Sequence, residues 1–437
     1  MRPIVLLVPA AVALAGCDRS SPPRETGERS LLKQSTATPA RSRAAGQDII
    51  PYERPELWPL QLSSARIVVH YRTADEQAMA AQIRAHVEHA WHVQIDRGGA
   101  SPPLDDHGAA GPDGRFDVYV WRGIDTLYVD AIAPDATTSY DDRSTFMVLD
   151  PWGEYGGAEL EANIFHEMRH ASQASDDWWE HSHAFEADAT LWEVASYGFR
   201  RLPLVWRDYQ AHPEWTLFRD DAYRTWYMYG GALFLLYLRD HVFHGDLSFS
   251  NDMWRRCRNA PGAEADRSLN EPDFADALQA LLAAQGSSLF DQVLGFARAR
   301  WHTGVRANGS LPGGADLPEV AHRTHTRKPG AKQTRFSVAP QMLGTSYVVV
   351  KRAATDPAAL WVSLSTTNQE ARFVVQTVDG LVGDATLALG GGPARVSFGA
   401  GRTVTFVVTA LPANGAFDPD RVGDAPMNAS LILSTTR

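Results

Sequence analysis

The stretch HEMRHASQASDDWWEHSHAFEADATLWE, from His166 to Glu193, gathers four histidines and a series of Asp and Glu residues in one short segment. The preceding residues, GAELEANIF, have apolar side chains at helical spacing, which predicts one helix over residues 157–174. A second helical pattern covers residues 183–199. The histidines and the acidic residues are therefore expected on two neighbouring helices.

His166 and His170 are four positions apart, so their side chains leave the predicted helix on the same face, one turn apart. In that arrangement two imidazoles can bind one tetrahedral metal ion. Glu167 follows the first histidine and can reach a water molecule at the open metal position, where it would act as general base. The alternative is an exposed helix surface with two solvated histidines.

A catalytic zinc ion needs a third protein ligand and an open fourth position. Glu186, Thr190 and Glu193 share one face of the second predicted helix, at i, i+4 and i+7. Glu186 can therefore bind the metal, while Thr190 or Glu193 supports a histidine from behind. The same segment contains further candidate ligands: Asp176, Asp177, Glu180, His181 and His183.

These motifs resemble those of the gluzincins, zinc metallopeptidases with a glutamate as third ligand, and more closely those of a family of secreted bacterial metallopeptidases. The matching pieces are His166–Gln173, the pair Trp178–Trp179 and Glu186–Glu193. Ala187 stands where that family usually has glycine. The resemblance implies a zincin-like catalytic domain, a Zn²⁺ cofactor held by the two histidines and Glu186, and peptide or protein substrates.

The resemblance also implies a mechanism. Zinc would polarise a peptide carbonyl and lower the pKa of a bound water toward about 7, and Glu167 would move the water proton to the leaving amine. The oxyanion formed in this reaction needs a hydrogen-bond donor opposite the metal. The candidate donors are Tyr227, Tyr229 and His183, and we expect Tyr229, at the start of YGGALF, to be the catalytic one.

Outside this segment, the pattern changes from strands to helices along the chain. Apolar runs predict strands over residues 65–71, 115–121 and 144–150. Helical patterns cover residues 73–91, 224–243, 271–284 and 287–301. Strands followed by helices, without βαβ alternation, predict an α+β domain of a small sheet plus helices. We assign it residues 51–310.

Local signals place the ends of several of these helices. Thr73 and Glu76 have the spacing of a capping box at the start of the first helix. Asn270 and Ser288 are the expected N-caps of the last two helices.

The C-terminal part has a different pattern. Residues 311–334 are polar and rich in Gly and Pro, which predicts a solvated linker that includes HRTHTRKPGAK. Short alternating runs then predict strands over residues 345–352, 360–367, 371–378, 385–391, 394–398, 403–411 and 429–436. This spacing predicts an all-β sandwich domain over residues 335–437.

The N-terminal residues 1–17, MRPIVLLVPAAVALAGC, have the form of a signal peptide. Its end, Leu14 to Cys17, resembles the bacterial lipobox, in which the cysteine is acylated; a plain secretory signal is the alternative. Residues 18–50 are polar and Pro-rich, as in a disordered tether. We therefore expect an exported bacterial lipoprotein, anchored to a membrane by lipid on Cys17 and facing the periplasm or the cell surface.

Charge and cysteine content narrow the class further. A formal net charge of −11 over 437 residues argues against a nucleic-acid partner, which requires clustered Lys and Arg. If Cys17 carries lipid, Cys257 has no partner for a disulfide and is expected to be a buried structural thiol. These features predict a membrane-anchored zinc metallopeptidase of unknown oligomeric state. The alternative is a non-catalytic surface lipoprotein with a degenerate zincin site, which binds protein or glycan.

Overall fold

The computed structural model describes residues 58–102, 114–124, 127–134, 138–153, 156–220, 224–260, 270–379, 385–387, 392–399, 401–420 and 423–437. The predicted signal peptide, Cys17 and the predicted tether lie outside the described residues. Within those ranges, no helix combines the length and the apolar character needed to cross a membrane.

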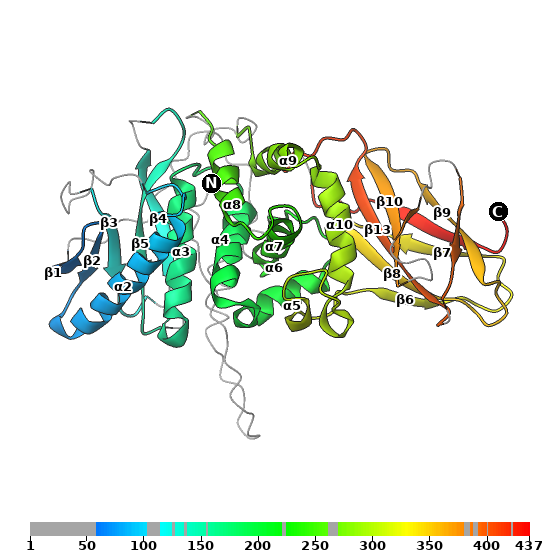
Figure 1. Cartoon of the computed structure of the whole chain (residues 1–437), viewed down its shortest axis with the longest axis horizontal. Coiled ribbons are helices and arrows are strands. Elements are labelled where there is room, and N and C mark those ends of the chain that lie inside the picture. The colour runs from blue at the N-terminus through cyan, green and yellow to red at the C-terminus, as the bar shows by residue number, and fades with distance from the viewer. Residues whose placement is uncertain are drawn as a thin grey trace, which may run out of the picture.

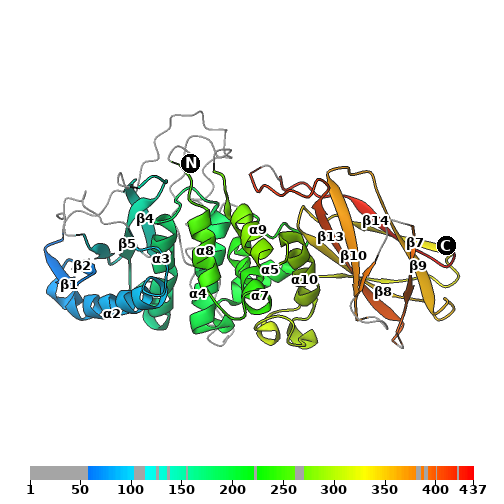
Figure 2. The ribbon, with the colours of Figure 1, turned by 45° about the horizontal axis from the view of Figure 1, so that its top comes forward.

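A five-stranded sheet forms one end of the molecule (Figures 1 and 2). Its strands are β1 (Leu60–Ser63), β2 (Ile67–Tyr71), β3 (Phe116–Val120), β4 (Leu127–Pro134) and β5 (Arg143–Leu149), in the order β1-β2-β3-β5-β4. The three predicted strands are the central parallel ones, β2, β3 and β5. The pattern did not predict β1 and β4, which pair antiparallel at the two edges.

Two helices, α2 (Gln77–Gln94) and α3 (Leu160–Ala174), pack on the sheet and against each other. Side chains alternate along the buried strands, and Val69, Val118 and Met147 belong to the core that includes these helices. The predicted capping box precedes α2: the Glu76 carboxylate accepts from the backbone N–H of Thr73 at 3.3 Å. The sheet therefore supports α3, the helix that carries the histidine motif.

The central part of the molecule is helical (Figure 1). Its helices are α4 (Ser182–Tyr197), α5 (Pro203–Ala211), α6 (Tyr227–Gly230), α7 (Ala232–His241), α8 (Ser248–Arg256), α9 (Phe274–Ala284) and α10 (Leu289–Trp301). Helix α4 runs antiparallel to α3, because Gln173 lies beside Phe185 whereas His166 lies beside Glu193. Cys257, after α8, is a fully buried free thiol, as expected.

One of the two predicted N-caps is wrong. Ser288 caps α10 by accepting from the backbone N–H of Asp291. Helix α9, however, is capped by Asp273, whose side chain accepts from the backbone N–H of Ala275 and Asp276. Asn270 instead accepts a side-chain hydrogen bond from Asn259 at 2.8 Å. Pro272 explains the shift, since proline disfavours helical geometry in the residue before it and the helix begins later.

The C-terminal region is a sandwich of two sheets. One has the order β11-β10-β13-β8-β6 and the other β12-β9-β14-β7. The strands are β6 (Arg323–Thr326), β7 (Gln333–Val338), β8 (Thr345–Lys351), β9 (Ala359–Thr366), β10 (Ala371–Val378), β11 (Ala385–Leu387), β12 (Ala394–Ser397), β13 (Thr403–Pro412) and β14 (Ala429–Ser434). Apolar side chains from both sheets, such as Phe406 and Leu431, share one core.

The segment predicted as a linker has more structure than its composition suggests. Strand β6 lies within residues 311–334 and pairs in parallel with β8. The sandwich also packs on the helical region, where Tyr347 of β8 donates to the Ala297 carbonyl of α10 at 2.6 Å. The α+β fold with a C-terminal β-sandwich is confirmed.

Candidate metal centre

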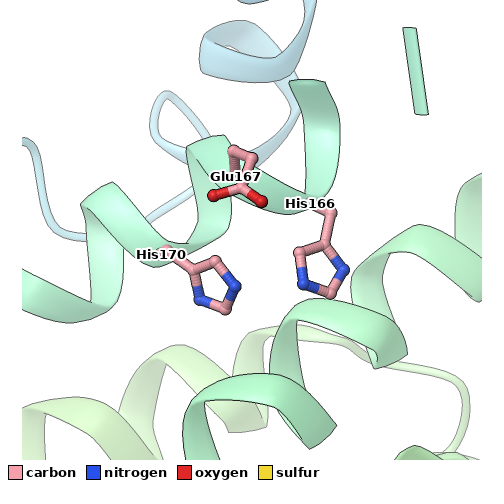
Figure 3. A group of neighbouring side chains, drawn as sticks. All are labelled: His166, Glu167 and His170. Atoms are coloured by element: carbon pink, nitrogen blue, oxygen red, sulfur yellow. The ribbon is translucent and has the colours of Figure 1, made fainter. Parts of the chain in front are cut away.

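His166 and His170 lie on α3 with their side chains almost completely buried, at 1% and 0% exposed. Their ring centroids are 4.7 Å apart. Figure 3 shows both rings on the same side of the helix, one turn apart, as the four-residue spacing predicts. An exposed helix surface with two solvated histidines is therefore excluded.

Glu186 lies on α4, and its carboxylate is close to both histidine rings. Its Oε2 lies 3.2 Å from Nε2 of His166 and 3.7 Å from Nε2 of His170. Two ligand atoms on one tetrahedral zinc ion, each 2.0–2.1 Å from the metal, are separated by roughly 3.3 Å. The two distances from Glu186 are therefore close to the separation that suits one zinc ion, and two histidines with a glutamate form a donor set found in catalytic zinc sites.

The hydrogen bonding of His170 supports this fit. Its Nε2 is buried and makes no hydrogen bond with any described residue. Burial and the neighbouring His166 lower the pKa of His170 well below its usual value, so the ring is neutral. A neutral buried imidazole with a free lone pair is the form that binds metal.

A second carboxylate contacts the Nδ1 atom of His166, whereas Glu186 lies near Nε2. Glu193 lies 3.0 Å from Nδ1 of His166, and Arg201 donates to the other oxygen of Glu193 at 2.8 Å. Arg201 also pairs with Glu159. Burial opposes the charged form of His166, but Glu186 and Glu193 outweigh it and raise its pKa to about 10. Without metal, the His166 ring is therefore protonated on both nitrogens and positively charged, and Glu193 orients it.

His170 has a different partner, which the sequence motifs did not predict. Gln173 lies one turn further along α3 and places Oε1 2.8 Å from Nδ1 of His170. The i, i+3 spacing could have identified it, because such residues share a helix face. Thr190 is buried on α4, but its hydroxyl makes no hydrogen bond with any described residue. Glu193 and Gln173 therefore orient the two rings.

Glu167 lies close to the two histidines. One oxygen of its carboxylate and one ring nitrogen of each histidine all lie within 4.8 Å of one another. The side chain is fully buried, and this burial raises its pKa well above the usual value, although the charge of His166 partly offsets the effect. A carboxyl group with a raised pKa is better suited to accept a proton and return it.

The three candidate oxyanion donors differ in their contacts. The ring of Tyr229 lies 6.1 Å from that of His166, centroid to centroid. Tyr227 donates to the Trp215 carbonyl at 3.3 Å, and His183 packs edge-on against Phe274. Of these three residues, Tyr229 is the one whose ring lies beside a candidate ligand, His166.

The other acidic candidate ligands make local contacts, and His181 pairs with Asp420 at 2.8 Å. Asp176 accepts from Arg258 at 2.8 Å, and Glu180 accepts from the backbone N–H of Phe274 at 2.7 Å. Asp177 accepts from the backbone N–H of Trp179 at 2.8 Å. Trp179 and its neighbour Trp178 are buried in the main core.

No protein-family model matches the chain. No curated protein matches it either. Among solved structures, the chain is similar to PliG of Salmonella Typhimurium, a periplasmic lysozyme inhibitor of g-type lysozyme, with a TM-score of 0.19 and 13% identity over 26% of this chain and 98% of that chain. A TM-score this low supports no argument about this chain.

Proposed function

We propose that the chain is a zinc-dependent metallopeptidase of the gluzincin type, with zinc held by His166, His170 and Glu186. The observation that carries the proposal is the convergence of one oxygen and two ring nitrogens, from two helices, in a fully buried position. Both rings are also oriented from behind, as metal-binding histidines usually are.

The proposed chemistry is hydrolysis of a peptide bond. A zinc ion here would supply a Lewis acid that polarises the carbonyl and activates water. Glu167 would take the proton from that water and return it to the leaving amine, roles that suit a carboxyl group with a raised pKa. Tyr229 would donate a hydrogen bond to the developing oxyanion, a role supported by its place beside His166.

The predicted lipid anchor at Cys17 would keep this activity at a membrane, facing the periplasm or the cell surface. The anchor is tested separately from the activity. Metabolic labelling with a fatty acid should label the wild-type chain and not Cys17→Ala. Equal labelling of both chains would reject it.

The first test is metal content. The wild-type fragment 51–437, loaded with zinc and dialysed, should hold about one zinc ion per chain, whereas His166→Ala and Glu186→Ala should hold none. A wild-type chain without zinc would contradict the proposal and favour a non-catalytic binding module.

The second test is turnover. Zinc-loaded wild type should cleave members of a peptide library, and Glu167→Gln should keep its zinc but lose cleavage by about 10²–10⁴-fold. Equal cleavage by the two proteins would reject Glu167 as the base. Stoichiometric zinc with no cleavage of any peptide would reject the peptidase assignment and leave the metal centre intact.

A further inference from the structure

Asp188 is a buried carboxylate that the proposed metal centre does not use. It lies two residues after Glu186, so its side chain leaves α4 on the opposite side. Its Oδ2 accepts from Arg169 Nε at 2.6 Å, Gln173 Nε2 at 2.9 Å and Trp254 Nε1 at 2.8 Å. Asp188 therefore joins three elements, α3, α4 and α8, behind the histidines.

Gln173 connects Asp188 to His170. Its Nε2 donates both to Asp188 and, at 3.1 Å, to the backbone carbonyl of Phe185. A carboxylate and a carbonyl oxygen can only accept, so the amide nitrogen must face them. The amide oxygen of Gln173 must then face Nδ1 of His170, 2.8 Å away.

This orientation determines the tautomer of His170. Because an amide oxygen only accepts, Nδ1 of the neutral ring must carry the hydrogen. The lone pair is then on Nε2, the nitrogen 3.7 Å from Oε2 of Glu186. The opposite orientation of the Gln173 amide would put a hydrogen on Nε2 and prevent it from binding a metal.

We propose that Asp188 is a positioning residue for the metal centre: through Gln173 it sets the tautomer of His170 and keeps Nε2 free for the metal. This inference rests on the proposed metal centre and extends it to residues that touch neither metal nor substrate.

Arg169 keeps the Asp188 carboxylate in place. The two form a fully buried ion pair, and Arg169 also donates to Asn251 at 2.7 Å and to Ser250 at 3.1 Å. Such a pair could also serve only to hold α3, α4 and α8 together. Trp254 allows the two roles to be tested separately, because it donates to the same oxygen of Asp188 and, among the described residues, makes no hydrogen bond to Gln173 or His170.

The experiment measures zinc affinity of the full chain by competition with a chromophoric chelator, alongside unfolding by urea. Gln173→Leu should weaken zinc binding by about 10–100-fold, and Asp188→Asn by on the order of tenfold. Trp254→Phe, the matched control, should lower stability but leave zinc affinity within about twofold. It removes one hydrogen bond to Asp188 but keeps the relay from Asp188 through Gln173 to His170. The double variant Gln173→Leu/Asp188→Asn should bind zinc no more weakly than Gln173→Leu alone, because Asp188 acts through Gln173.

A second readout needs no metal. In the metal-free wild type, the ¹⁵N shifts of labelled His170 should show hydrogen on Nδ1, and in Gln173→Leu this preference should disappear. Additive losses of zinc affinity in the double variant, or an unchanged tautomer in Gln173→Leu, would overturn the relay. A wild-type chain with the expected tautomer but no zinc affinity would overturn both the proposed function and the role of Asp188 in metal binding.

Discussion

Zinc should raise the thermal stability of this chain, and Glu186→Gln should remove most of that effect. The Glu186 oxygen lies 3.2 and 3.7 Å from the two histidine Nε2 atoms and is the only anionic member of the proposed ligand set. Glutamine has nearly the same size but no charge, so the change alters metal affinity with little change in packing.

The size of the effect follows from linkage. A metal that binds only the folded chain stabilises it by about 4 kcal/mol when free zinc is 1,000 times Kd. In a folding unit of about 250 residues each kcal/mol shifts Tm by about 2–4 °C, so the wild-type Tm should rise by about 8–16 °C. Mutation of residues that only support a ligand weakens metal binding by up to about 100-fold. If Glu186→Gln weakens zinc binding by about that factor, the same free zinc concentration stabilises the variant by about 1.4 kcal/mol. The Tm shift then falls to about 3–6 °C.

The assay is thermal unfolding followed by circular dichroism, with free zinc set by a chelator buffer. Thr190→Val is the matched control, because Thr190 is buried on the same helix and its hydroxyl makes no hydrogen bond among the described residues. It should keep the full zinc shift. Equal zinc shifts in the wild type and Glu186→Gln would refute the assignment of Glu186, and no shift in the wild type would refute the metal centre.

Three further changes test other parts of the structure. Glu167→Gln should keep the full zinc-induced Tm shift, since Glu167 is proposed as base and not as ligand; a lost shift in the same assay would contradict that division of roles. Burial and the nearby Glu180 raise the pKa of Asp273 to about 8. Because this folded-state pKa lies above the ordinary 3.8, Asp273 should make stability fall as pH rises from about 4 to 8. Asp273→Asn, which retains the helix cap, should reduce that fall in urea unfolding at pH 5 and pH 8; parallel curves for both proteins would count against it. Tyr347→Phe removes the hydrogen bond to Ala297 between the sandwich and α10 and should lower the free energy of unfolding by about 1 kcal/mol, measured with urea. The control Thr366→Val removes an exposed hydrogen bond within the sandwich and should lower it less. An equal loss in both variants would show that the contact to α10 adds no more stability than the exposed bond.

Local spacing was enough to predict several features of this protein. The four-residue spacing of His166 and His170 on a helix places both rings on one face whatever surrounds them. Ser288 was likewise identifiable as a cap, because capping depends on adjacent backbone groups. The alternating strands predicted the sandwich, because alternation reflects one buried face per strand.

Edge strands and polar strands were harder to predict. Strand β1 has alternate half-exposed positions, and β6 consists of polar residues, RTHT. Neither has a run of apolar residues, so each is a strand only because a neighbouring strand supplies its hydrogen bonds.

The tertiary structure decided which residues lie together at the proposed metal centre. Several acidic residues and histidines follow His170 within a short distance, and helical spacing alone could not choose among them. The packing of α4 against α3 brings Glu186 to the two rings and places Glu193 behind His166. Gln173 and Asp188 could not be connected by sequence, because a hydrogen bond between two helices depends on their relative position, which local periodicity does not specify.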